Sequence, residues 1–397
     1  MLNTYKIDGQ ELDSLDLKAL LVTRGMSIAP EVPERFGATH RVRGLTDPTG
    51  CNCAILPDGV LAHMTNLGPG MPFSMDVDDG GNAYIAHKGQ FLTNVTFPPK
   101  TEFYAQRTSS GMPFGELAVL QGLDVLSFAY LWPCEFAQRG LPCQFCYPGV
   151  ETARRAREGE AEPPSPTPQD VAEVVNFGVN VEHCVWDVQV TGGSKFEARA
   201  ECSLVAEIIH AIDDVAGLDN VPGEIYVYTT APIEPSAIDE VFEAGADRVA
   251  YDMNIWDPDV FRKVCPGHAR FTGRDEQLAA LEYIIDRYGR GKACSAFVVG
   301  IEPLDSLLEG AEYVGSRGIV PLASVWLPHG RPVLGGLQPP GVEYYRRVWR
   351  AFAEIYETHD LEPPGTAGFN VCMCRDAYNY REDILGGTRP DMAEAAR

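Results

Sequence analysis

The sequence is short of positive charge. Its 397 residues hold 32 Lys and Arg against 56 Asp and Glu, which gives a formal net charge of −24. Proteins bind phosphate backbones through clusters of Lys and Arg, so this balance argues against a nucleic acid as partner. No stretch approaches the roughly 18 consecutive apolar residues of a membrane-spanning helix. We therefore expect a protein that binds neither nucleic acid nor membrane.

Targeting signals and histidine metal motifs are also missing. The first residues, MLNTYKIDGQELDSLDL, show no basic region followed by an apolar stretch, so we expect no secretory leader and a cytoplasmic location. The eight histidines form no His-x-x-x-His pattern. Without export, the eleven cysteines are expected to be reduced thiols and metal ligands, not disulfides. A hydrophobic fraction of 45% is typical of a globular enzyme.

Three cysteines lie in one short segment, LWPCEFAQRGLPCQFCYP, at 131–148. Eight residues separate Cys134 from Cys143, and two separate Cys143 from Cys146. Cysteines with two residues between them can point both sulfurs at one metal, and a third thiol adds another ligand. Three protein ligands leave one position open to a molecule that is not protein. The spacing itself allows a metal site, a structural zinc loop or buried thiols.

Apolar, β-branched runs alternate with amphipathic stretches from about residue 126 onward. The apolar runs occupy 126–130, 185–190, 224–230, 247–254, 293–299 and 320–326. Helical periodicity spans about 200–214, 235–244, 274–288 and 306–316. Strands that alternate with helices predict a parallel α/β sheet, either a barrel or a doubly wound open sheet. Both folds bind ligands at the carboxyl ends of the strands.

The cysteine loop and the strand ends resemble the radical S-adenosylmethionine superfamily, and biotin synthase-like enzymes in particular. That family usually has three residues between its first two cysteines, where this chain has eight, and an aromatic residue at the place of Phe145. The resemblance covers about 126–334 and implies a partial (β/α)6 TIM-type barrel. It also implies that Cys134, Cys143 and Cys146 hold a [4Fe–4S] cluster, with S-adenosylmethionine on the open iron.

Two strand ends imply further contacts with S-adenosylmethionine. Thr191, Gly192 and Gly193 are similar to the Gly-Gly-Glu turn whose backbone meets the amino group of the cofactor, with Ser194 in place of the glutamate. Asn254 matches an asparagine that reaches the ribose hydroxyls in biotin synthase-like enzymes.

Later strand ends imply an adenine contact and a substrate site. Gly300 and Ile301 are similar to part of a Gly-x-Ile region that packs on adenine. The side chains at strand ends that we expect to meet a small polar substrate are Tyr228, Thr230, Asp252, Trp326, His329 and Arg331.

The resemblance implies an enzyme that cleaves S-adenosylmethionine to methionine and a 5′-deoxyadenosyl radical. This radical would abstract hydrogen from a small-molecule substrate held in the barrel, and an electron donor such as flavodoxin or ferredoxin would supply the electron. Two other functions fit three cysteines: a zinc-binding structural or metallochaperone protein, and an iron–sulfur electron carrier.

We expect three regions along the chain. An N-terminal helix and β-rich extension covers 1–122, the barrel covers 123–335, and a C-terminal helix with an irregular tail covers 336–397. Short alternating runs separated by Gly, Pro and Asn predict the strands of the extension. Apolar and aromatic residues at helical spacing predict a helix at about 342–358.

Two more cysteine pairs flank the barrel region. They are Cys51 with Cys53, and Cys372 with Cys374. If the two ends of the chain met, these four thiols would suit a second iron–sulfur cluster. Cysteine is also among the most buried residue types, and packing roles are the interpretation that we favour for all four.

Overall fold

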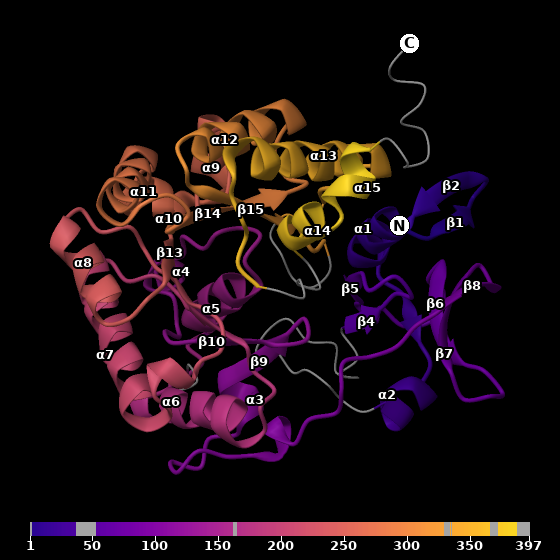
Figure 1. Ribbon diagram of the computed structural model, residues 1–397, viewed down its shortest axis with the longest axis horizontal. Coiled ribbons are helices and arrows are strands. Elements are labelled where there is room, and N and C mark those ends of the chain that lie inside the picture. The colour runs from indigo at the N-terminus through magenta and orange to yellow at the C-terminus, as the bar shows by residue number, and fades with distance from the viewer. Residues whose placement is uncertain are drawn as a thin grey trace.

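The computed structural model describes residues 2–36, 53–161, 165–328, 334, 336–365 and 372–386. A curled sheet stands at the centre of the molecule, with helices along its outer side and a separate β-rich part beside it (Figure 1). No helix in the described ranges is long and apolar enough to cross a membrane.

The central sheet has seven strands in the order β15–β14–β13–β12–β11–β10–β9. These strands are β9 (Ala118–Gln121), β10 (Val125–Ala129), β11 (Asp187–Thr191), β12 (Ile225–Tyr228), β13 (Arg248–Ala250), β14 (Ala293–Val299) and β15 (Val320–Val325). Strands β10 to β15 pair in parallel, each with the next along the chain. Strand β9 runs antiparallel to β10. The predicted partial (β/α)6 barrel is confirmed, and the doubly wound alternative is wrong because the strand order never reverses.

Helices connect the parallel strands, and most of them lie along the outer face of the sheet (Figure 1). They are α4 (Glu135–Gln138), α5 (Tyr147–Glu158), α6 (Pro168–Asn176), α7 (Ala198–Ala216), α8 (Pro235–Glu243), α9 (Pro258–Val264), α10 (Pro266–Phe271), α11 (Arg274–Tyr288) and α12 (Leu304–Ser316). Helix α7 buries Val205, Ile209 and Ile212, whose spacing of three and four residues forms one apolar stripe. Shorter turns of helix are α3 (Phe114–Leu117), Phe103–Ala105, Phe177–Val181 and Leu218–Asn220.

The N-terminal part contains the expected short strands. Its elements are β1 (Thr4–Ile7), β2 (Gln10–Asp13), α1 (Ser14–Arg24), β3 (Ser27–Ile28), α2 (Glu31–Phe36), β4 (Cys53–Ile55), β5 (Leu61–His63), β6 (Phe73–Val77), β7 (Ala83–His87) and β8 (Gln90–Asn94). Strands β3, β6, β7 and β8 form one sheet, and β4 pairs with β5. Asp13 begins α1 with a capping box. The Asp13 side chain accepts from the Asp16 amide, and the Asp16 side chain accepts from the Asp13 amide.

The C-terminal helices join this part to the barrel. They are α13 (Val342–His359), α14 (Cys374–Asn379) and α15 (Arg381–Leu385), and they lie between α12 and α1 in Figure 1. Two buried ion pairs tie α1 to them: Arg346 Nη2 lies 2.6 Å from Asp16 Oδ2, and Lys18 Nζ lies 2.6 Å from Asp376 Oδ2. Lys18 also donates to the Cys372 carbonyl at 3.0 Å. We call this contact between α1, α13 and α14 the terminal seam.

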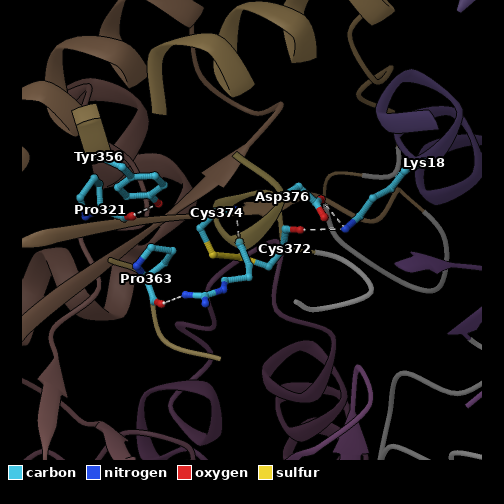
Figure 2. The surroundings of a disulfide bond; sticks show 8 residues. Lys18, Pro321, Tyr356, Pro363, Cys372, Cys374 and Asp376 are labelled. Carbon is cyan, nitrogen blue, oxygen red and sulfur yellow. Dashed lines mark hydrogen bonds and ion pairs between the residues drawn. A yellow bond between two sulfur atoms is a disulfide. The ribbon is translucent and has the colours of Figure 1, made fainter. Parts of the chain in front are cut away.

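The C-terminal pair of flanking cysteines lies at this seam. Cys372 and Cys374 form a disulfide beside Lys18 and Asp376 (Figure 2). The expectation of reduced thiols is wrong for this pair, because one intervening residue brings their Cα atoms to 5.7 Å. Cys53 is a buried free thiol, and burial raises its pKa to about 12. Cys51 lies outside the described residues, so the second cluster stays untested.

Candidate functional site

The three loop cysteines line one cavity of about 460 Å³ at the carboxyl ends of the parallel strands. Cys134 directly precedes α4, and Cys146 directly precedes α5. Five other residues predicted to bind the cofactor also lie on the cavity wall: Phe145, Thr191, Gly192, Gly193 and Asn254. The fold therefore gathers residues from 134 to 254 around one space, as expected for the carboxyl edge of a parallel barrel.

Backbone hydrogen bonds hold the cysteine loop against the turn that follows β11. The Tyr130 amide donates to the Thr191 carbonyl at 2.8 Å, and the Gly193 amide donates to the Leu131 carbonyl at 2.9 Å. One step further along, the Glu135 amide donates to the Ser194 carbonyl at 2.9 Å. These bonds continue the pairing of β10 with β11 and fix the position of Cys134.

The two glycines of this turn are required by the closeness of the loop. A Cβ atom on Gly193 would lie 2.7 Å from the Cα of Cys134. A Cβ atom on Gly192 would lie 3.0 Å from the Leu131 amide nitrogen. Neither contact is with a flexible side chain, so the backbone itself would have to move. The glycine pair thus has a clear packing role beside the first cysteine, whatever it contacts in a ligand.

The second half of the loop is anchored to the corner between α9 and α10. Gln144 donates twice to this corner, from its amide to the Val264 carbonyl and from its side chain to the Lys263 carbonyl, both at 2.8 Å. Cys143 packs against the buried thiol of Cys265. Cys265 is therefore both a buried core residue and a contact of the loop.

The loop thiols have the chemistry of a thiolate metal site. Burial raises the pKa of Cys134, and it raises the pKa of Cys146 to about 12. A hydrogen bond with Cys265 raises the pKa of Cys143, and burial adds to it. These thiols are neutral until a metal supplies positive charge, and soft sulfur donors suit iron–sulfur clusters. Among the described residues, no group of three or more His, Cys, Asp or Glu side chains is arranged so that it could hold a metal ion, the three loop thiols included.

Asp252 is the acidic group at the end of β13. Its Oδ1 accepts from the Ala296 amide at 2.9 Å, and its carboxyl group lines the cavity. Burial raises its pKa to about 6. Gln277 donates to the Asp252 carbonyl at 2.8 Å and also lines the cavity. Gln277 stands in the amphipathic helix α11, and no local motif marked it as a site residue.

Asn254 adopts a backbone conformation that side chains other than glycine seldom take. Its φ is +57°, and its side-chain amide donates to the Asp252 carbonyl at 3.0 Å. Asparagine tolerates this left-handed region better than most residues because its short side chain bonds to nearby backbone. The turn directs Asn254 to the cavity, where its predicted contact with ribose stays a prediction.

Other predicted residues lie apart from the cavity lining. Gly300 faces Pro340 and Tyr345, while Ile301 packs with Trp326 in the small apolar cluster around Cys265. The remaining predicted substrate contacts fall into three groups. Tyr228 and Asp252 line the cavity and Thr230 does not, whereas His329 and Arg331 lie outside the described residues.

Besides Gln277, two more cavity residues were not marked by the sequence patterns. His268 follows Cys265 in the corner after α9, and its ring meets the Phe136 ring edge-on at 5.2 Å. Glu201 is fully buried and accepts from the Tyr130 hydroxyl at 2.7 Å and from the Lys195 amide at 2.8 Å. A helical glutamate gives no local sign of such a role, because most helical glutamates face solvent.

The chain is similar to one curated enzyme over most of its length. Bacteriochlorophyllide c C-7(1)-hydroxylase from Chlorobaculum limnaeum is 20% identical over 353 residues, which cover 87% of this chain and 85% of that one. No family model matches the chain.

Several solved structures are similar in part. Methylornithine synthase is 13% identical with a TM-score of 0.44, over 58% of this chain and 62% of that protein, which is less than two thirds of its length. A radical SAM methyltransferase from Sphaerobacter thermophilus is 14% identical with a TM-score of 0.43, over 77% of this chain and 82% of that one. Coproporphyrinogen III oxidase from Escherichia coli, a radical SAM enzyme, is 13% identical with a TM-score of 0.36, over 60% of this chain and 53% of that one.

Proposed function

We propose that this chain is a radical S-adenosylmethionine enzyme with a [4Fe–4S] cluster, and that it uses the cavity to bring S-adenosylmethionine and a small-molecule substrate together. When bound, the cluster supplies one electron that splits S-adenosylmethionine into methionine and a 5′-deoxyadenosyl radical, which takes hydrogen from the substrate. The observation that carries this proposal is the set of three free thiols, Cys134, Cys143 and Cys146, on the wall of one cavity.

Three protein thiols are one fewer than a closed cluster site uses. Zinc in a structural site normally takes four protein ligands, and electron-carrying clusters are also held by four. The cavity beside the three thiols provides room for a non-protein ligand on the fourth position. This favours the radical enzyme over the zinc protein and the electron carrier.

The remaining cavity residues would position S-adenosylmethionine and the substrate. The backbone at Gly192 and Gly193 forms the wall next to Cys134, where a cofactor's polar groups would find unobstructed amides and carbonyls. We assign Asn254 to the ribose of S-adenosylmethionine.

Part of the cavity wall suits an apolar substrate. It consists mainly of apolar side chains from α3 and from β9, β10 and the segment after it: Leu117, Ala118, Val119, Phe128, Ala129, Leu131 and Trp132. The curated relative is named as a hydroxylase of a bacteriochlorophyllide, which is a largely apolar ring system. We infer that this enzyme changes a carbon–hydrogen bond on an apolar substrate, with Asp252 or Tyr228 contacting its polar group.

Anaerobic reconstitution tests the proposal. The protein should bind about four irons per chain and, with dithionite, convert S-adenosylmethionine to 5′-deoxyadenosine. Cys143→Ala should lose both properties. Cys184→Ala is the matched control, because Cys184 is a free cysteine outside the cavity lining and should keep both.

Asn254→Ala tests the cofactor assignment separately. Loss of ribose hydrogen bonds, each worth about 1 kcal/mol, should weaken S-adenosylmethionine binding several-fold while iron content stays at about four. Stoichiometric zinc with no iron after reconstitution would overturn the enzyme proposal. Unchanged cofactor affinity in Asn254→Ala would overturn only the role of Asn254.

A further inference from the structure

Two exposed aromatic rings lie on the outside of the cysteine loop. Phe196 is 38% exposed and Phe271 is 42% exposed. Their ring centroids are 4.8 Å apart in an edge-to-face arrangement. Both rings also contact the buried Phe136, at 5.5 and 5.4 Å. Clustered exposed phenylalanines mark an interaction surface more often than a solvated one.

Positive charge surrounds these rings. The Arg139 guanidinium lies 5.7 Å from the centre of the Phe196 ring, and the Arg270 guanidinium lies 5.2 Å from that of Phe271. Lys263 is exposed on the neighbouring helix α9. In the described part of the chain, none of these three cations has an ion pair. We call Arg139, Phe196, Lys263, Arg270 and Phe271 the Phe–Arg patch.

The local charge is opposite to that of the whole chain. Residues 260–274, VFRKVCPGHARFTGR, contain four Lys and Arg and no Asp or Glu, whereas the chain has 56 acidic residues against 32 basic ones. Arg262 pairs with Asp259, and Glu197 is an exposed acid next to Phe196. Glu135 accepts from the Phe196 amide, and the exposed Asp275 and Glu276 follow the basic segment, so positive charge is confined to the patch itself, whose three charged side chains are all cations.

One layer of side chains separates the patch from the cavity. Phe136 lies beneath both exposed rings and is two residues from Cys134. His268 packs on Phe136 and lines the cavity from the other side. Cys265, in the same basic segment, touches Cys143. An electron that enters at the patch therefore has a short route to the loop thiols.

We propose that the Phe–Arg patch is the docking surface for an acidic ferredoxin-type carrier, which reduces the cluster. This rests on the proposed function. The step moves one electron: the carrier's iron–sulfur centre is oxidised by one electron, the [4Fe–4S] cluster is reduced by one, and no bond forms or breaks. The net charge of −24 repels an acidic carrier over most of the surface, so complementary charge steers it to the patch. Exposed Phe and Arg then supply the contact area typical of interface centres.

Charge reversal tests the docking surface. In the reconstituted protein, Arg139→Glu with Arg270→Glu should slow cluster reduction by a reduced acidic [2Fe–2S] ferredoxin at least tenfold at low salt, followed by visible absorbance. Reduction of the wild type should slow as salt rises, and that of the double variant should respond little. The single change Lys263→Glu should give a smaller loss in the same direction.

The control moves the same charge elsewhere. Lys100→Glu with Arg350→Glu alters two exposed cations outside the patch and should leave ferredoxin reduction within twofold of wild type. Dithionite is too small to need a docking surface, so it should reduce all four proteins equally and drive cleavage of S-adenosylmethionine in each.

The outcomes separate the two proposals. Wild type without iron, or without dithionite-driven cleavage, contradicts the proposed function. Wild type that works with dithionite while patch and control variants are reduced by ferredoxin at equal rates overturns the docking surface alone. The wild type could also be a dimer that the patch variant makes monomeric, with no change in the rate of reduction by ferredoxin. That result would assign the patch to contact with a second copy of this chain and would also overturn the proposal.

Discussion

The terminal seam and the cavity both bury ionisable groups, but they differ in how completely those groups are paired. At the seam, each charge has an opposite partner: Asp16 meets Arg346, and Lys18 meets Asp376. In the cavity wall, the Asp252 carboxyl group accepts from one amide and forms no ion pair within the described ranges, and burial raises its pKa to about 6. Complete pairing suits a structural joint, whereas incomplete pairing leaves a group ready for a ligand.

The largest effect is expected from breaking the seam. Arg346→Met leaves the Asp16 carboxylate buried without its cation, and such changes typically cost about 3–5 kcal/mol. Urea unfolding of the two proteins measures the difference in the free energy of unfolding. Arg350→Met on the same helix is the control, because Arg350 is 43% exposed and its pair with Glu354 contributes at most about 1 kcal/mol. Equal losses in the two variants would show that the seam is not special.

A smaller effect of opposite sign is expected in the cavity. The pKa of Asp252 is higher in the folded protein, at about 6, than the ordinary 3.8. Its contribution to stability is therefore full below pH 4 and is lost as pH rises through 6. Asp252→Asn removes that loss and keeps an acceptor for the Ala296 amide, so it should be more stable than wild type by about 3 kcal/mol at pH 7.5.

Urea unfolding at two pH values measures this effect. At pH 4 the advantage of Asp252→Asn should disappear, because the wild-type carboxyl is then largely neutral too. Substrate-dependent activity should fall in the same variant. An advantage that is the same at both pH values would mean that Asp252 does not carry a buried charge.

The smallest effect is expected from the disulfide. Cys372→Ser with Cys374→Ser opens a ring that spans one intervening residue. The unfolded chain gains little entropy, so the free energy of unfolding should change by no more than about 1 kcal/mol. Iron content after reconstitution should stay at about four per chain. A drop in iron in this variant would instead support a second cluster near the seam.

Much of the barrel was predictable because its signals are local. Each parallel strand is an apolar run, and each cysteine of the loop is visible by its spacing. The strand boundaries shifted by a few residues, as at β11, which begins at Asp187 where the apolar run begins at Val185.

Contacts between distant segments were not predictable. The ion pair of Lys18 with Asp376 joins residues 358 positions apart, and neither residue has a neighbour in sequence that marks it. Gln277 and His268 reach the cavity only because α10 and α11 fold back over the strand ends. Such pairings depend on the three-dimensional path of the chain, which a pattern of apolar residues does not contain.

The last strand of the barrel shows why the C-terminal segment matters beyond its own helices. Strand β15 is almost wholly buried, and its free side is covered where the Met373 amide donates to the Ala323 carbonyl at 2.7 Å and Cys372 bridges to Ser324. The Tyr356 hydroxyl donates to the Pro321 carbonyl on the same strand (Figure 2). Proteolysis that removes residues after 365 would uncover an apolar edge strand, and such edges recruit strands from other molecules. A clipped preparation should therefore precipitate while its cluster loop is still intact.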